Sequence, residues 1–465
     1  MSHDLLTGTT LRNRTAKATA DLSLRSTLQY VTDRLATSGV AGAGLLDNWE
    51  ELRDAARAQR AQIISRLPEI LAQLADRWEA NGGRVFWAAD AEEARGYISE
   101  VVSRRQAKRV VKSKSMATEE IGLNDALESQ GVEVVETDLG EWIIQLADQP
   151  PSHIIAPAIH LTRDDVRDIF NREPASAGAL SNVPEELCAF AREQLREKFL
   201  TADVGISGCN MAVAETGSMV LVTNEGNGRM VTSLPPVHIA VMGMERVVET
   251  WEQLDLILAL LPRAATGQDL SVYTTQVTGP RRPGEIDGPE ELHLVILDNG
   301  RSELIGGEFQ EMLNCIRCGA CLNVCPVYRQ VGGHAYGWCY SGPMGAVLIP
   351  LLNRAEEAGE LSGASTLCGA CYDACPVKIP LQDLLLALRR KRVDEEATRA
   401  QRVAWKTWAT AWSHPQSYRA STAAAARVGR VLPTRLFPHA WAAGREIPRA
   451  RTGPSFRQRL ARGEI

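Results

Sequence analysis

Seven of the ten cysteines fall in two short motifs that each end in Cys-Pro. The first motif reads Cys-Ile-Arg-Cys-Gly-Ala-Cys-Leu-Asn-Val-Cys-Pro and begins at Cys315. Ferredoxin segments use this C-x2-C-x2-C-x3-C-P spacing, in which three thiolates bind one iron–sulfur cluster and the fourth cysteine binds another. The spacing therefore predicts electron-transfer chemistry, with Cys315, Cys318 and Cys321 on one cluster and Cys325 on a second.

The second motif contains Cys368, Cys371 and Cys375, and it lacks one cysteine. Ser365 stands where the first cysteine of a complete motif belongs. One cluster is therefore expected to have three cysteine ligands, which leaves three alternatives open. It is a [3Fe-4S] cluster, or a [4Fe-4S] cluster with a non-cysteine ligand, or it recruits Cys339 from between the motifs. Cys339 as a packed, buried thiol is the competing interpretation.

Structural zinc and disulfide bonds are the other roles that such cysteines take. Zinc needs four ligands and gains nothing from a run of this length, so the spacing favours clusters. Disulfides are disfavoured because the first residues show no basic and apolar signal peptide. The expected location is the cytoplasm, where thiols stay reduced. Cys188 and Cys209 lie outside the motifs and are expected to be buried thiols.

Two further segments carry side chains that suit a small ligand. Lys112 and Lys114 follow a predicted strand, at the sheet edge where ligands of α/β proteins usually bind. Two lysines and two serines there suit an anion, although a plain polar loop is the alternative. Glu215 lies among small residues between apolar stretches, where it is either a buried acid or a turn cap. These three residues are the candidate substrate-binding set.

The elements that must position these groups follow from hydrophobic periodicity. Residues 1–80 have a helical pattern, in which Arg53, Arg57, Arg60 and Arg66 are expected to form a solvated face. Short apolar runs then alternate with helical segments through residues 81–300, which predicts an α/β domain with a mainly parallel sheet. Residues 153–156 are a predicted strand of this domain. Residues 271–277 and 291–297 are predicted edge or hairpin strands.

The remainder divides into a cysteine region and a tail. The linkers around the cysteines, residues 301–390, have helical patterns, which predicts an all-α, ferredoxin-type domain with two clusters. Residues 391–465 form a predicted helical extension. Within it Trp405, Trp408 and Trp412 share one helix face, expected to be a packing face.

Charge and hydropathy narrow the classes of partner. From residue 381 onward there are 17 Lys and Arg against 6 Asp and Glu, although the whole chain carries a net charge of −6. The basic residues form no compact block, so we expect docking on an acidic partner or on the chain's own acidic body, and no nucleic acid. No apolar run approaches the roughly 18 residues of a membrane span, so membrane contact is expected only through partners.

Taken together, the motifs resemble the lactate utilization protein B family, the iron–sulfur subunit of a bacterial system that oxidises L-lactate. The resemblance covers roughly residues 20–440 and rests on segments 112–116, 119–120, 215–224, 230–244, 315–329, 332–337, 341–343 and 364–381. It implies two [4Fe-4S] clusters, a lactate-utilization domain and two partner subunits. It also implies the ligand sets: Cys315, Cys318, Cys321 and Cys375 for one cluster, and Cys325, Cys368 and Cys371 for the other.

Three functions follow as hypotheses. The first is an electron-transfer subunit that passes electrons from L-lactate oxidation through two clusters to an acceptor. The second is a stand-alone redox enzyme whose α/β domain binds an anionic metabolite. The third is a redox-sensing scaffold protein. The sequence shows no dinucleotide- or phosphate-binding glycine motif, so it offers no hydride carrier.

Overall fold

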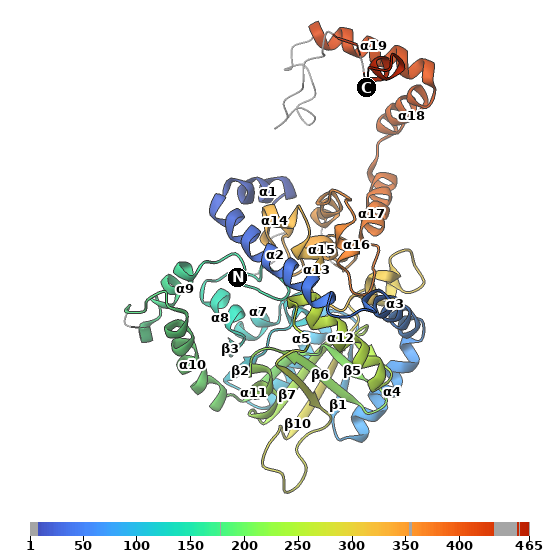
Figure 1. The fold of residues 1–465 in the computed structure, drawn as a ribbon. Helices are drawn as coiled ribbons and strands as arrows, with labels where there is room; N and C mark the ends of the chain where they lie inside the picture. Colours follow the sequence, from blue (N-terminus) through green and yellow to red (C-terminus); the bar gives the residue numbers. More distant parts are fainter. Residues whose placement is uncertain (1–7, 177, 353–355, 432–452, 455, 465) are drawn as a thin grey trace. The chain divides into compact units, whose positions relative to one another are not determined.

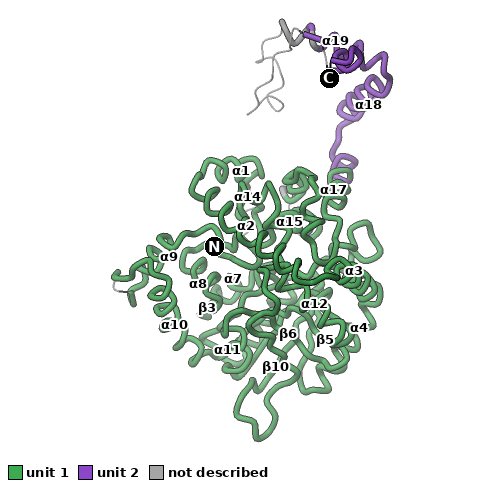
Figure 2. Tube along the Cα trace, viewed as in Figure 1, with its two compact units in different colours: residues 1–390 green, residues 391–465 purple. Residues whose placement is uncertain are grey.

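The computed structural model describes residues 8–176, 178–352, 356–431, 453–454 and 456–464. The chain forms two compact units, Met1–Arg390 and Lys391–Ile465, which Figure 2 draws in different colours. The first unit opens with four helices: α1 (Leu11–Ala20), α2 (Leu22–Ala43), α3 (Trp49–Ser65) and α4 (Leu67–Ala80). Side chains cap two of them, because Thr10 accepts from the Asn13 N–H and Asp21 accepts from the Leu24 N–H.

A six-stranded sheet forms the centre of the first unit (Figure 1). Its strand order is β1-β10-β7-β4-β2-β3, and every pair of neighbours is parallel. The strands are β1 (Arg84–Ala88), β2 (Arg109–Lys112), β3 (Glu133–Glu136), β4 (Val204–Gly208), β7 (Val237–Gly243) and β10 (Glu291–Leu297). The predicted α/β domain with a mainly parallel sheet is confirmed.

Helices connect these strands and cover both faces of the sheet. Adjacent residues of β2 show this, because Val110 and Val111 are both buried but belong to different apolar cores. Both faces of a parallel sheet are covered in this way when crossover helices join its strands. The helices are α5 (Ala91–Arg104), α6 (Met116–Glu120), α7 (Leu123–Glu128), α8 (Leu139–Leu146), α9 (Arg163–Phe170), α10 (Pro184–Leu200), α11 (Asn227–Ser233) and α12 (Trp251–Thr266).

The order of the strands creates a switch point between β2 and β4. From β2 the chain moves outward to β3 at the edge of the sheet. It then returns to β4 on the other side of β2 and continues away through β7 and β10. Connections that leave two neighbouring strands in opposite directions open a crevice at the carboxyl ends of those strands.

A second, four-stranded sheet has the order β8-β5-β6-β9. Its strands are β5 (Met211–Val213), β6 (Ser218–Thr223), β8 (Val247–Val248) and β9 (Tyr273–Val277). Buried residues of β5, β6 and β8 share one apolar core with α3, α4 and α12. The same core continues into the cysteine region, so the cysteine loops are anchored on the α/β domain.

The cysteine region is helical, as predicted. Its α-helices are α13 (Ala320–Asn323), α14 (Tyr328–Val331), α15 (Gly342–Leu352), α16 (Ala370–Asp373) and α17 (Leu381–Glu396). Among the described residues, the 3-10 helices are η1 (Pro174–Ser176), η2 (Ser302–Leu304), η3 (Gln310–Asn314), η4 (His334–Tyr336) and η5 (Glu356–Gly363). Cys321 lies in α13 and Cys371 lies in α16, so each motif runs from a loop into a short helix.

Three predicted details of the sheet are wrong. Residues 153–156 form a turn, because the His153 ring accepts hydrogen bonds from the Ile155 and Ala156 N–H groups. β10 is no edge strand, since it lies between β1 and β7. β4 was not predicted as a strand, because its Gly-Ile-Ser-Gly sequence is short and weak in strand-forming residues.

The second unit contains α18 (Arg399–Ser413), α19 (Pro415–Val431) and α21 (Phe456–Ala461). Trp405, Trp408 and Trp412 share one face of α18, and their rings contact one another and Tyr418. All three tryptophans are nevertheless exposed, so the predicted packing face is only partly covered among the described residues. No helix in the described part of the chain is long and apolar enough to cross a membrane.

Candidate functional site

The two cysteine motifs contribute to one shared group of thiols. Cys315, Cys318 and Cys321 of the first motif line a small, mostly apolar cavity together with Cys375 of the second motif. Burial, and then the neighbouring thiols Cys318, Cys315 and Cys375, raise the pKa of Cys321 well above its usual value. Four thiols that perturb one another in an apolar cavity form a ready set of ligands once they lose their protons to a metal.

A second group of thiols lies between the motifs. Burial, followed by Cys325 and Cys368, raises the pKa of Cys371 to about 12. Cys325 and Cys371 are buried, whereas Cys368 is exposed. The seven motif cysteines therefore fall into a set of four and a set of three, and each set takes members from both motifs.

The backbone repeats itself in the two loops. Arg317 and Leu367 have φ of 60° and 56°, and the glycines two residues later, Gly319 and Gly369, have φ of 76° and 84°. Glycine adopts this left-handed conformation without steric cost, which explains the Cys-Gly-Ala-Cys sequence of both motifs. The backbone therefore adopts the same left-handed conformation at the same positions in each motif.

Backbone N–H groups donate to the sulfur atoms. The Arg317 N–H lies 3.4 Å from Cys315 Sγ, the Tyr328 N–H 3.5 Å from Cys325 Sγ, and the Ile379 N–H 3.4 Å from Cys375 Sγ. Such donors stabilise negative charge on sulfur and tune the reduction potential of an iron–sulfur cluster. Among the described residues no three His, Cys, Asp or Glu side chains gather closely enough to hold a single metal ion. The donor chemistry of both thiol sets fits the larger iron–sulfur clusters.

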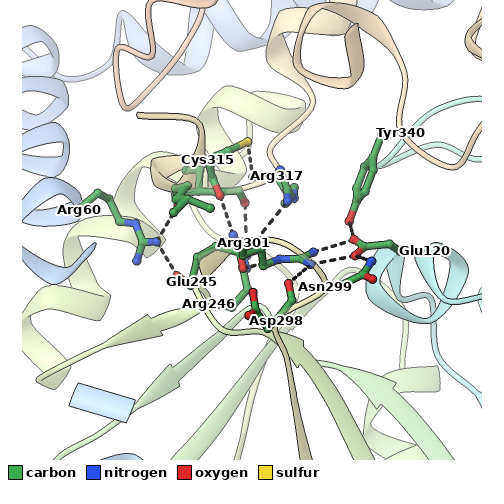
Figure 3. Close-up of polar contacts among 12 residues, drawn as sticks. Arg60, Glu120, Glu245, Arg246, Asp298, Asn299, Arg301, Cys315, Arg317 and Tyr340 are labelled. Atoms are coloured by element: carbon green, nitrogen blue, oxygen red, sulfur yellow. Dashed lines mark hydrogen bonds and ion pairs between the residues drawn. The ribbon is translucent and has the colours of Figure 1, made fainter. Parts of the chain in front are cut away.

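Buried arginines hold the loop of the first set in place. Arg53 donates to the Cys375 and Tyr372 carbonyls at 2.9–3.0 Å, and Arg246 donates to the Cys315 carbonyl at 3.0 Å. Arg60 donates to the carbonyls of Glu245, Val247 and Leu313, and Figure 3 shows Arg60 beside Glu245. Burial, and then the charge of Arg246, lower the pKa of Arg60 to about 10, so the side chain stays charged at neutral pH. The predicted solvated face is therefore wrong for Arg53 and Arg60.

A buried ion network joins this loop to the parallel sheet (Figure 3). Arg301 pairs with Glu120 at 2.6 Å and with Glu245 at 2.8 Å. Arg317 pairs with Glu245 at 3.2 Å and lies over the Tyr340 ring, whose hydroxyl donates to Glu120. Burial alone would raise the pKa of Glu245, but the surrounding arginines outweigh it and lower that pKa. The network joins Glu120 and Glu245 of the α/β domain to Arg317 and Tyr340 of the cysteine region.

A larger cavity of about 500 Å³ opens beside this network. Its walls come from the loops that follow β2, β4 and β7, which are the carboxyl ends of three neighbouring strands. The charged and polar residues that line it include Lys114, Asp138, Asn210, Glu225, Asn227, Glu245, Arg246, Arg301, Arg317 and Tyr340. Small-molecule sites in proteins have volumes of roughly 300–1,000 Å³, so the size suits an organic ligand.

Comparison with known proteins identifies the family to which this chain is similar. Residues 71–297 match the LUD domain, residues 311–379 match the 4Fe-4S dicluster domain, and residues 390–464 match the family model described as "Lactate utilisation protein B, C-terminal". The lactate utilization protein B of Shouchella clausii is 52% identical over 427 residues, which cover 91% of this chain and 88% of that protein.

The chain belongs to the lactate utilization protein B family. Two other members show the same similarity. The protein from Bacillus licheniformis is 52% identical over 85% of this chain and 83% of its own length. The protein from Oceanobacillus iheyensis is 52% identical over 86% of this chain and 84% of its own length. The family resemblance inferred from the motifs is thereby confirmed, as is the iron–sulfur character of this lactate utilization protein B family member.

The structure does not bring the three candidate substrate-binding residues together. Lys114 lines the large cavity. Lys112 is buried and pairs with Glu119 and Glu136, both at 2.7 Å. Burial would lower the pKa of Lys112, but these two carboxylates outweigh it and raise that pKa. Glu215 accepts from the Trp251 N–H at 2.7 Å, so it caps α12. Lys112 and Glu215 have structural partners, and only Lys114 faces the ligand space.

The surroundings of Cys339 and Ser365 bear on the alternatives left open for the second cluster. Cys339 is buried, and burial followed by Glu120 and Glu119 raises its pKa well above the usual value. The charged groups that perturb it are Glu120, Glu119 and Arg317, and no thiol of the second set is among them. The Ser365 hydroxyl accepts from the Leu367 N–H within its own loop. Cys339 therefore has the surroundings of a packed thiol in this lactate utilization protein B family member.

Sequence reasoning missed the arginines and the asparagine of the cavity. Both arginines could have been found from the sequence. Arg317 is a cation within the first cysteine motif, and Arg246 is a cation just after the end of strand β7. Asn227 lies in a polar Asn-Glu-Gly-Asn-Gly segment that gave no comparable signal. Which of these cations faces the ligand space depends on long-range pairing, which a single sequence does not show.

Proposed function

We propose that this protein is the iron–sulfur electron-transfer subunit of an L-lactate oxidising complex in the cytoplasm. Its two clusters carry electrons, one at a time, from lactate oxidation to an acceptor. The observation that supports this most directly is the division of seven thiols into two neighbouring sets across the motifs. The names of its relatives, lactate utilization protein B, support the choice of lactate.

Under this proposal Cys315, Cys318, Cys321 and Cys375 are the ligands of the first [4Fe-4S] cluster. Cys325, Cys368 and Cys371 are the ligands of the second. The second cluster is then a [4Fe-4S] cluster with a non-cysteine fourth ligand, or a [3Fe-4S] cluster. We propose four domains with different roles. Residues 1–80 form the N-terminal helices, and residues 81–300 contain the ligand cavity. Residues 301–390 hold the clusters, and residues 391–465 contact the partner subunits.

The chain's own residues supply the environment for transfer. Apolar side chains such as Ile154, Met344 and Val377 exclude water from the first thiol set. N–H groups stabilise the charge on sulfur, and Arg53 and Arg246 hold the loop rigid, so that the surroundings reorganise little when charge changes. In keeping with the family resemblance, lactate oxidation itself is assigned to two partner subunits, with the basic C-terminal extension as a contact surface.

The test is anaerobic purification with iron and sulfide analysis, followed by activity measurements. Two clusters predict about eight iron atoms per chain, or about seven with a three-iron cluster. The isolated chain is expected to show no L-lactate oxidation with an artificial acceptor until the copurifying subunits are added. Robust turnover by the chain alone would favour the second hypothesis, a stand-alone enzyme, over the electron-transfer subunit.

A further inference from the structure

The large cavity stands at the place where the fold itself predicts a ligand. Its lining includes Ser113–Ser115 after β2, Gly208–Asn210 after β4, and Val241–Gly243 at the end of β7. The switch point of the sheet lies between β2 and β4. Open α/β sheets bind ligands in the crevice outside the carboxyl ends of strands at such a point. Position alone therefore favours a binding site over an incidental gap.

Three buried polar atoms in the cavity lining have no hydrogen-bond partner within the described part of the chain, and their donor or acceptor character indicates what a ligand must supply. The Lys114 amine and Arg317 Nη1 are buried donors without a hydrogen-bond acceptor among the described residues. Neither group can accept a hydrogen bond, so the ligand must supply acceptors. Asn227 is 6% exposed, and its Oδ1 has no donor. An unpaired buried polar group is energetically unfavourable, and a complementary ligand removes that cost.

No described residue accepts a hydrogen bond from the Lys114 amine. The amine lies 3.6 Å from Glu141 Oε1, within ion-pair range but beyond hydrogen-bond distance. Burial raises the pKa of Glu141 well above its usual value, which weakens this carboxyl group as a counter-ion. At the other end of the network, Glu245 is shared by Arg301 and Arg317, and Arg246 donates to the carbonyls of Cys315 and Ile316. The cavity therefore combines cationic donors with the neutral amide of Asn227 and the carboxyl groups of Asp138 and Glu225.

We propose that this cavity binds a hydroxylated organic anion. The carboxylate or phosphoryl oxygens of the ligand accept hydrogen bonds from Lys114 and Arg317. A hydroxyl of the ligand donates to the Asn227 amide, with Asp138 and Glu225 as further acceptors in the lining. A hydroxycarboxylate has both features, and so does a small phosphorylated alcohol. The site depends on the proposed function only in the choice of L-lactate as the first probe.

The experiment measures binding by isothermal titration calorimetry on the full, anaerobically purified chain. Three probes separate the sources of the oxyanion: L-lactate, pyruvate and glycerol 3-phosphate. Pyruvate has the carboxylate of lactate without its hydroxyl, so it isolates the contribution of Asn227. Because the measurement needs no electron transfer, failure of the proposed electron route leaves its outcome unaffected.

The test variant and its matched control replace lysines at opposite ends of β2. Lys114→Met removes the cation that follows β2, whereas Lys108→Met removes an exposed lysine that precedes the same strand. Lys114→Arg keeps the charge and serves as the conservative rescue. Asn227→Leu removes the unpaired amide with little change in shape. Iron content and the melting temperature of each variant establish that it folds and holds its clusters.

The expected result is saturable binding of L-lactate or of glycerol 3-phosphate, whichever oxyanion the site takes. Lys114→Met is expected to weaken it by about tenfold or more, the factor that 1.4 kcal/mol produces. Lys108→Met and Lys114→Arg are expected to stay within about threefold of the wild type. If the site takes carboxylates, pyruvate binds more weakly than L-lactate, and Asn227→Leu removes that difference. Absence of saturable binding by all three probes overturns the proposal, and so does equal binding by the Lys114→Met and Lys108→Met proteins.

Discussion

The two thiol sets share a backbone conformation but differ in their surroundings. The first set lines an apolar cavity, and Arg53 and Arg246 hold its carbonyls. In the second set Cys368 is exposed, and the loop is held by Arg389, a half-buried residue that donates to the Ser362 and Ser365 carbonyls. The same motif therefore builds an enclosed site beside the ligand cavity and a shallower site open to solvent. This difference favours the second site as the point where a partner exchanges electrons.

The largest expected effect is the loss of one cluster when a cysteine of either thiol set is replaced. Cys315→Ser and Cys375→Ser are expected to abolish the same cluster, because their thiols line one cavity. Cys325→Ser is expected to affect the other cluster. Each variant should lose about half of the bound iron, and electron paramagnetic resonance of the reduced proteins identifies which signal disappears. Different signals lost from Cys315→Ser and Cys375→Ser would contradict the crossed assignment.

The arginines around the first set give the next largest effect. Arg60→Met leaves buried carbonyls of Val247 and Leu313 unpaired, at a cost of about 1–3 kcal/mol of unfolding free energy for each. Arg57→Met on the same helix is the matched control, since Arg57 forms a half-exposed ion pair with Glu311. Such a pair contributes about 0–1 kcal/mol. Denaturant titration of both variants is the measurement, and equal losses would show that the buried arginines do not anchor this site.

Exposure predicts a difference in stability toward air. The second cluster has three cysteines, one of them exposed, so it should lose iron first. In air-treated wild-type protein a three-iron resonance is expected to grow while the signal of the first cluster persists. Clusters that decay at the same rate would remove the distinction between an enclosed and a shallow site.

The smallest effect concerns Cys339. Its perturbing neighbours are Glu120, Glu119 and Arg317, so Cys339→Ser should leave the spectrum of the second cluster unchanged. Placing a hydroxyl in this buried position should cost only about 1 kcal/mol or somewhat more. A three-iron signal in freshly purified Cys339→Ser protein, before any oxidation, would identify Cys339 as the missing ligand.

The sequence predicted those features of the structure that depend on interactions between residues close together in the chain. The cysteine spacing and the alternation of strands and helices both depend on neighbours a few residues apart. The start of α9 shows how local such interactions are, because both hydrogen bonds of a capping box between Thr162 and Asp165 are present. The helical character of the cysteine region was predictable for the same reason.

Features that depend on distant partners were not predictable. Arg60 has the spacing of a solvated residue, yet its partners lie more than 180 positions away along the chain. Glu215 resembles a buried acid in sequence, and its role as a cap for α12 depends on a residue 36 positions away. Cys188 was expected to be buried, but it is exposed on α10. In each case tertiary packing decided the environment, and the residue type alone did not.

Arg317 links the first thiol set to the large cavity. Its backbone N–H donates to Cys315 Sγ, while its side chain pairs with Glu245 and lines the large cavity. An anion that binds this guanidinium offsets a positive charge close to a cluster ligand, and so disfavours the reduced state. Thermodynamic linkage makes the effect reciprocal, so reduction must weaken anion binding by the same factor. Under the two proposals, one residue would couple the redox state of the protein to retention and release of its ligand.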